Sequence, residues 1–416
     1  MLLRLKFNII FAPCDVRRAQ SVLKFDSKRN NFITVIKSTT LCIEASAPSG
    51  SDSSAPDLPA LPISLENLYR FSQCILDSKH DHPKKRAVIC SGNDPQMITR
   101  CCLLLGGYFV VYHDVELKEL EEMFAPISGG FVPMRASLED DECVTVLDCW
   151  RALHHTKRLN WYDFTTAEVD IDCCIDMLEY LHYDNPANGS MHSIVPGKLL
   201  AFSCPAQLPD GVEWADAGGA RSFSAGYFAD IFGDFGVRMV VRCGGAIYDA
   251  RAFERCGIGV EDLLLGAAGP AASGADMLRA VDRFMTLTRL SPGAVAVHGG
   301  APDGSLGPGG RLLVEAYLIR QHGFGGPDAL AWALMAHPAP ATRAAALVAV
   351  EETAGWGLIR RVASSSAAAP SREGGPGESA QDGLGSPAQA WSRDRLPRSR
   401  SLPGPGGRDP AGAGAG

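Results

Sequence analysis

Apolar and polar positions repeat with two different periods along the chain, and these periods predict its helices and strands. Apolar residues spaced three and four positions apart predict helices. The helical segments are 64–80, 94–113, 116–127, 145–164, 168–184, 247–257 and 275–293. Short β-branched runs bounded by glycine, asparagine or proline predict buried strands. The strand segments are 86–92, 192–206, 237–245, 260–266 and 294–298.

Strands and helices alternate through the second half of the chain. This order predicts an α/β fold, with a mostly parallel sheet covered by helices on both faces. The ligand site of such a sheet lies beyond the carboxyl ends of its strands. At the carboxyl end of one predicted strand, His298 is followed by a glycine-rich loop and then by an apolar helix. This layout predicts a phosphate pocket, because the free N–H groups of a helix N-terminus attract anions.

Composition divides the chain into four parts. Residues 46–60 are rich in serine, proline and alanine, and the sequence after about residue 362 is dominated by serine, alanine, glycine and proline. Neither stretch has enough large apolar residues to form a core. We therefore expect a poorly ordered extension over 1–60, domains over 61–190 and 191–362, and a disordered tail over 363–416.

Charge and cysteine usage exclude several classes of protein. The net charge of −8 disfavours a general nucleic-acid binder, which would be basic, and no apolar run is long enough to cross a membrane. The 13 cysteines are irregularly spaced and the 10 histidines do not cluster with them, which disfavours a zinc site. We expect reduced thiols, no metal, no cofactor, and a nuclear or cytoplasmic location.

Several motifs resemble one family of enzymes. They are "TVLDCWRAL", "WYDF", "EYLHYDN", "IVPGKLLAFSCP", "VRCGGAIYDARAFERCGIGVEDL" and "GAVAVH", in that order along the chain. They are similar to motifs of the mitotic-exit dual-specificity phosphatases, the cell-division-cycle fourteen type, over roughly residues 62–340. The resemblance implies two tandem phosphatase-like α/β domains, each a mostly parallel sheet flanked by helices. It also implies that the first domain recognises peptide, that the second carries a cysteine nucleophile, and that the substrates are proteins phosphorylated at Ser-Pro sites near basic residues.

The catalytic loop of such phosphatases reads His-Cys-x5-Arg, and this chain departs from it. The cysteine thiolate attacks phosphorus and the arginine binds the phosphate oxygens. Gly299 follows His298 where the cysteine belongs. An alternative alignment of "LGPGG" moves the nucleophile position to Pro302 and the arginine position to Pro308. No cysteine follows Cys256, so neither alignment supplies a nucleophile.

The general acid implied by the resemblance is missing too. It is expected just after the strand 260–266, but no carboxylate lies between Asp262 and Asp276. We expect Asp262 before or within the strand and Asp276 at a helix start. Asp303 would repel phosphate, and Ser305 has no neighbouring general base, which a serine nucleophile needs.

A few residues remain candidates for binding. Arg311, Gly307, Gly309 and Gly310 are the phosphate-binding candidates, although Arg311 also fits an ordinary helix-surface arginine. His298 fits a buried, hydrogen-bonded histidine as well as a catalytic one. The candidates for a peptide groove are Glu179, Tyr180, Tyr183 and Asp184, with the acidic cluster 139–142 either beside them or simply solvated.

Three hypotheses follow. The chain is a pseudophosphatase that binds phosphopeptides; or it is an active phosphatase whose loop is misread in this sequence; or it is a scaffold that binds partners independently of phosphate.

Overall fold

The computed structural model describes a core region with gaps. The described residues are 3–14, 18–19, 32–37, 63–81, 83, 86–135, 143–164, 174–217, 220–245, 247–263, 274–300, 304 and 306–338. Several predictions fall outside this set: the linker over 46–60, the acidic cluster over 139–142, the loop residues Pro302, Asp303 and Ser305, and the tail from residue 363.

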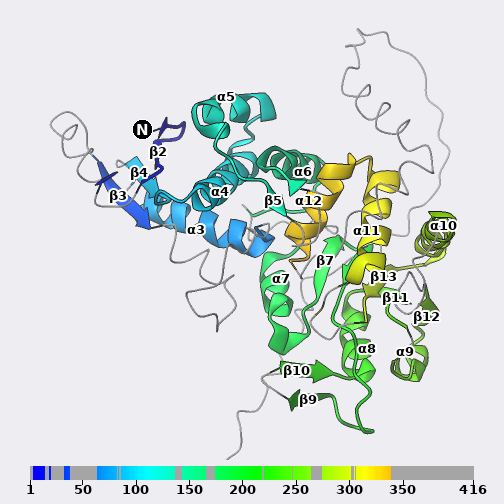
Figure 1. The fold of residues 1–416 in the computed structure, drawn as a ribbon. Helices are drawn as coiled ribbons and strands as arrows, with labels where there is room; N and C mark the ends of the chain where they lie inside the picture. Colours follow the sequence, from blue (N-terminus) through cyan, green and yellow to red (C-terminus); the bar gives the residue numbers. More distant parts are fainter. Residues whose placement is uncertain are drawn as a thin grey trace, which may run out of the picture.

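The first unit contains a four-stranded sheet in the order β1-β2-β4-β3 (Figure 1). The strands are β1 (Leu3–Arg4), β2 (Ile9–Ala12), β3 (Phe32–Lys37) and β4 (Arg86–Cys90). The prediction of a poorly ordered extension over 1–60 is therefore wrong for residues 3–14 and 32–37. β2 and β3 both pair in parallel with β4, far along the chain, and a pattern within residues 1–60 cannot reveal such a partner.

The helices that follow overlap the predicted segments, although α6 ends at Arg158 and α7 begins at Met177. They are α3 (Leu65–Asp81), α4 (Pro95–His113), α5 (Leu117–Ser128), α6 (Val146–Arg158) and α7 (Met177–Asp184), with a short ladder of β5 (Met134–Arg135) and β6 (Cys143–Val144). The start of α4 follows from its sequence, because Asp94 accepts a hydrogen bond from the Met97 N–H and Pro95 occupies the first turn. The apolar residues of α4 cover its whole circumference, and it is buried where it packs on α3 and α6.

The second unit contains a five-stranded sheet in the order β12-β11-β13-β8-β7. The strands are β7 (His192–Val195), β8 (Leu199–Ala201), β11 (Val237–Arg242), β12 (Gly259–Asp262) and β13 (Ala294–His298). All neighbouring pairs are parallel except β7 with β8, so the prediction of a mostly parallel sheet is confirmed. The other elements are η2 (Pro186–Asn188), α8 (Ala225–Asp234), α9 (Arg251–Arg255), α10 (Gly274–Leu290), α11 (Gly307–His322), α12 (Gly326–Ala336) and the hairpin of β9 (Trp214–Ala217) with β10 (Ala220–Phe223).

The second sheet is buried on both faces. Val295 and Val297 belong to the large core that also contains α4 and α6, whereas Ala294 and Ala296 belong to the core around α8. Neighbouring residues of a strand point to opposite faces, so this division explains why the segment 294–297 is apolar throughout.

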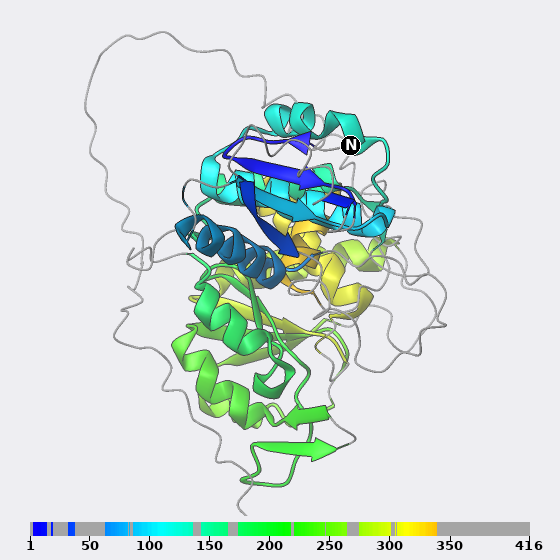
Figure 2. The ribbon, with the colours of Figure 1, turned by 90° about the vertical axis from the view of Figure 1, so that its left-hand side faces the viewer.

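One helix connects the two units. α12 packs on α6, and Figure 2 shows the yellow and orange helices lying between the two sheets. The Trp332 indole N–H donates to the Ile194 carbonyl of β7 at 3.0 Å, and its ring lies 5.7 Å from that of Trp161. Residues of both units therefore share one continuous core.

Candidate functional site

The strand–loop–helix layout predicted around His298 is present. β13 ends at His298, the loop passes through Gly299, Gly300 and Gly304, and α11 begins at Gly307. Gly304 and Gly307 have φ values of +86° and +64°, a region that glycine enters without strain. Among the residues that the structure describes, Leu306 at the N-cap position makes no side-chain capping hydrogen bond. The free N–H groups of its first turn are therefore the anion-attracting part of the site.

The start of the phosphate loop lies in close contact with the segment that follows β11. A Cβ atom added to Gly244, just after β11, would lie 2.1 Å from Gly300 Cα and 2.2 Å from Gly300 N. Both sides of this contact are backbone, so a side chain at Gly244 would have to displace the loop. Gly244 thus fixes how closely the loop lies against the end of β11.

His298 is fully buried and fills a structural role. Its Nδ1 lies 2.6 Å from the Gly299 carbonyl, and its Nε2 lies 2.9 Å from the Tyr248 hydroxyl. A carbonyl can only accept, so Nδ1 carries the proton and Nε2 accepts from Tyr248. Burial lowers the pKa of His298 to about 4, although the Gly299 hydrogen bond favours the protonated form. This neutral histidine holds the end of β13 in place.

The two aspartates that flank the expected position of the general acid are both paired with arginines. Both oxygens of Asp262, the last residue of β12, accept from Arg242 at 2.7 Å. Asp276 lies in the first turn of α10 and pairs with Arg279. The expectations that Asp262 lies in a strand and Asp276 at a helix start are confirmed. Residues 264–273, where the acid is expected, lie outside the described part of the chain.

A sulfur atom lies beside the helix start, and sequence reasoning missed it. Cys243 follows β11, its N–H donates to the His298 carbonyl at 3.0 Å, and its Sγ lies 3.5 Å from the position of a Cβ on Gly310. The pairing of the two predicted strands would have indicated this position. Burial raises the pKa of the Cys243 thiol to about 12, so it stays protonated and is not a nucleophile at neutral pH.

Arg311 is buried in the interior, so its interpretation as a helix-surface arginine is wrong. Its side chain comes from the start of the second turn of α11, and one of its terminal nitrogens, Nη1, has no hydrogen-bond partner. Burial lowers the pKa of Arg311, while the negative charge of Glu315 one turn later opposes that shift. Among the other phosphate candidates, Gly309 and Gly310 are buried in the first turn, and Pro308 contributes no N–H.

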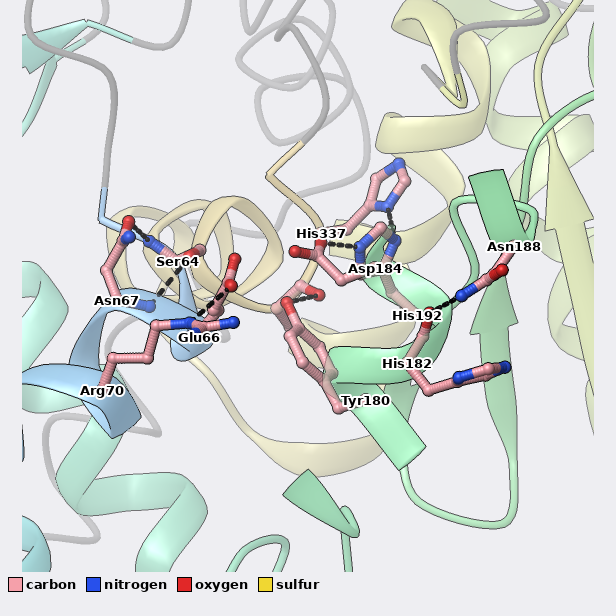
Figure 3. Close-up of polar contacts among 11 residues, drawn as sticks. Ser64, Glu66, Asn67, Arg70, Tyr180, His182, Asp184, Asn188, His192 and His337 are labelled. Atoms are coloured by element: carbon pink, nitrogen blue, oxygen red, sulfur yellow. Dashed lines mark hydrogen bonds and ion pairs between the residues drawn. The ribbon is translucent and has the colours of Figure 1, made fainter. Parts of the chain in front are cut away.

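The four groove candidates on α7 lie in two different surroundings. Tyr180 and Tyr183 are buried; Tyr180 donates to the Ala336 carbonyl at 3.0 Å. Asp184 accepts from His192 at 2.5 Å (Figure 3). Glu179 is half-buried, and its pKa is raised to about 7 by burial, with further contributions from the charges of nearby carboxylates. Glu179 is thus the member of this set best placed to meet a basic partner.

Other kinds of site find no support in the part of the chain that the structure describes. It contains no group of three or more histidine, cysteine, aspartate or glutamate side chains arranged to hold a metal ion. None of its helices is long and apolar enough to span a membrane. All of its cysteines are free thiols.

Comparison with known proteins gives a consistent set of relatives. No family model matches the sequence. The chain is 30% identical over 287 residues to dual specificity protein phosphatase CDC14AB of Danio rerio, a match that covers 67% of this chain and 43% of the relative. It is 28% identical to dual specificity protein phosphatase CDC14A of Homo sapiens, in a match that covers 67% of this chain and 44% of that relative. It is 26% identical to the tyrosine-protein phosphatase CDC14 homolog of Schizosaccharomyces pombe, in a match that covers 67% of this chain and 50% of that relative. The match thus spans half or less of each of these curated relatives.

Proposed function

The chain belongs to the CDC14 family of dual-specificity phosphatases, and we propose that within this family it is a pseudophosphatase that binds phosphorylated peptides without hydrolysing them.

The observation that carries this proposal is a phosphate-binding frame without reactive groups. Hydrolysis by this family's chemistry needs a thiolate against phosphorus and an acid that protonates the leaving oxygen. Gly299 has no side chain, and the buried Cys243 thiol stays protonated. Asp262 is held by Arg242 through both oxygens. We therefore expect this chain to form no phosphocysteine intermediate.

The groups that attract an anion remain. The first turn of α11, where Leu306 provides no side-chain cap, directs its N–H groups and the positive end of its dipole at the loop. Arg311 adds a positive charge just after that turn, with one nitrogen that lacks a partner. An arriving phosphate would give this nitrogen an acceptor.

For the partner, we propose a protein phosphorylated at a Ser-Pro site with basic residues nearby, in the nucleus or cytoplasm. Glu179 supports the basic preference, because Asp176 and Asp234 are close enough to raise its pKa together with burial. A lysine or arginine on the partner would favour the ionised form of this carboxylate and gain a charged contact.

The test compares binding with turnover in the full chain. Calorimetry should detect a Ser-Pro phosphopeptide with a following lysine and give at least tenfold weaker binding for the unphosphorylated peptide. A phosphate-release assay on the same peptide should stay at background. Release above background would overturn the proposal in favour of an active phosphatase, and equal affinity for both peptides would favour the scaffold hypothesis.

A matched pair of variants locates the binding site. Arg311→Met keeps most of the side-chain volume and removes the charge, so phosphopeptide affinity should fall tenfold or more. Arg279→Met removes an exposed arginine of α10 and should leave affinity unchanged. Thermal unfolding of both variants shows whether Arg311→Met still folds. Unchanged affinity of a folded Arg311→Met protein would contradict the assigned site.

A further inference from the structure

A row of polar side chains crosses the carboxyl end of the second sheet. In the strand register, Arg242 of β11 lies between Asp262 of β12 and His298 of β13. Residues two positions apart on a strand point to the same face. Val240 and Ala296, two positions before Arg242 and His298, belong to the core around α8. The polar row therefore lies on the face of the sheet that α8 covers, at the edge where the phosphate loop begins.

Each member of this row is held by the next. Both oxygens of Asp262 accept from Arg242 at 2.7 Å. Arg242 donates through Nη1 to the Tyr248 carbonyl at 3.3 Å, and its guanidinium carbon lies 5.3 Å from the centre of the Tyr248 ring. The Tyr248 hydroxyl then donates to His298 Nε2 at 2.9 Å. Arg242, Tyr248 and His298 are buried, so water competes little with these hydrogen bonds.

The polar row ends on the first peptide unit of the phosphate loop. The His298 ring packs on Phe202 in the α8 core, and its Nδ1–H donates to the Gly299 carbonyl at 2.6 Å. In a trans peptide unit, the carbonyl oxygen and the N–H of the next residue point in opposite directions. The Gly300 N–H therefore points away from the His298 ring. Gly300 is exposed, whereas Gly299 is buried, so an anion can reach this N–H.

We propose that Arg242 and Tyr248 are positioning residues of the anion site. Asp262 holds them in place, and they fix His298, which orients the Gly299–Gly300 peptide unit to receive the anion. The part concerning the anion rests on the proposed function, whereas the part concerning the peptide unit does not. Arg242 acts here through its geometry, because Asp262 already balances its charge.

The first readout needs no ligand. At neutral pH, the nitrogen NMR shifts of His298 in the full chain should show a protonated Nδ1 and a bare Nε2. Tyr248→Phe removes the hydroxyl that holds the ring, so the Gly300 amide resonance should move. Tyr162→Phe is the matched control and should leave that resonance in place, since Tyr162 is a buried tyrosine of the first unit whose hydroxyl donates to the Leu153 carbonyl. A proton on His298 Nε2 in wild type, or an unmoved Gly300 resonance in Tyr248→Phe, overturns the proposal.

The second readout is the affinity for inorganic sulfate, measured by calorimetry on the full chain. Tyr248→Phe should bind sulfate about tenfold more weakly than wild type, the equivalent of one hydrogen bond. Tyr162→Phe should bind it as wild type does, even if both variants lower the thermal unfolding midpoint equally. Wild-type affinity in a folded Tyr248→Phe protein would leave Tyr248 a structural role alone and overturn the proposal.

Two substitutions of Arg242 separate its position from its charge. Arg242→Lys keeps the positive charge but lacks the planar fork that binds both Asp262 oxygens and reaches the Tyr248 carbonyl, whereas Arg242→Met also removes the charge. Both should lose sulfate affinity to the same extent. Wild-type affinity in Arg242→Lys would mean that the charge acts and would overturn the positioning role. If wild type binds no sulfate while the Gly300 resonance moves in Tyr248→Phe alone, the peptide unit is held as proposed and the proposed function fails.

Discussion

Acidification should destabilise the protein through His298, and the sign follows from its burial. The pKa of His298 in the folded chain is about 4, below the ordinary value of 6.5. The folded state therefore binds fewer protons than the unfolded state between these values. The stability that depends on neutral His298 is fully present above about pH 6.5 and is lost as the pH falls toward 4.

The size of this loss follows from the two pKa values. Each pKa unit corresponds to about 1.4 kcal/mol, so the full difference of about 2.5 units is roughly 3.4 kcal/mol. At about pH 5, where the unfolded histidine is almost fully protonated and the folded one is not, the loss is about 2 kcal/mol. Because His298 is fully buried, solvent screening reduces this figure little.

Urea unfolding at about pH 7.5 and pH 5 tests this reasoning in wild type and His298→Asn. Asparagine keeps a donor for the Gly299 carbonyl but does not titrate, and it leaves the Tyr248 hydroxyl without its acceptor. The variant should be less stable at pH 7.5 by about 1–3 kcal/mol, the cost of an unpaired buried polar group. The difference between wild type and variant should shrink by about 2 kcal/mol at pH 5. Tyr248→Phe keeps His298 and should retain the wild-type pH dependence. A difference that is the same at both pH values would refute the argument.

Three further outcomes can be measured on the same protein. Gly244→Ala should displace the phosphate loop and cost about 1–3 kcal/mol in urea unfolding, whereas Gly233→Ala, in α8 with open space around it, should cost nothing. Iodoacetamide at about pH 8 should label the exposed Cys256 and spare Cys243 in the folded chain, as mass spectrometry of peptides would show; labelling of both at equal rates would contradict the high pKa of Cys243. Trp332→Phe should lower stability by roughly 1–3 kcal/mol, because the Ile194 carbonyl loses its donor and the core loses volume; an unchanged urea midpoint would argue against the bridging role of α12.

Sequence periodicity predicts the strands of the second sheet but misses the helices α8 and α12. The runs 237–245 and 294–298 contain the observed β11 and β13, and the segment 192–206 contains the β7–β8 pair with its turn. In the first sheet β4 lies in the predicted strand 86–92, but β1 and β2 were missed because they are short and β2 pairs with β4, more than seventy residues further along. The hairpin of β9 and β10 was missed as well, since its strands are short and only partly buried.

The site was predicted as a list of residues but not as a set of contacts. The order of residues shows that Gly299 cannot attack phosphorus, and the structure leaves that conclusion in place. The burial of Arg311 and the pairing of Asp262 with Arg242 depend on elements distant in the chain, so local patterns do not contain them. The predicted groove residues Tyr180 and Asp184 lie at the junction of the units, with partners from α12 and β7.

The bridging position of α12 also bears on how a chain of this kind could lose catalytic activity and keep its fold. α12 is held by Trp332 and by the aromatic residues of the first unit. Replacing the nucleophile at position 299 would leave these contacts of α12 in place. Selection for a folded chain would therefore not resist such replacements, and only selection for turnover would. Under relaxed selection for catalysis, the fold would be retained even if turnover were lost.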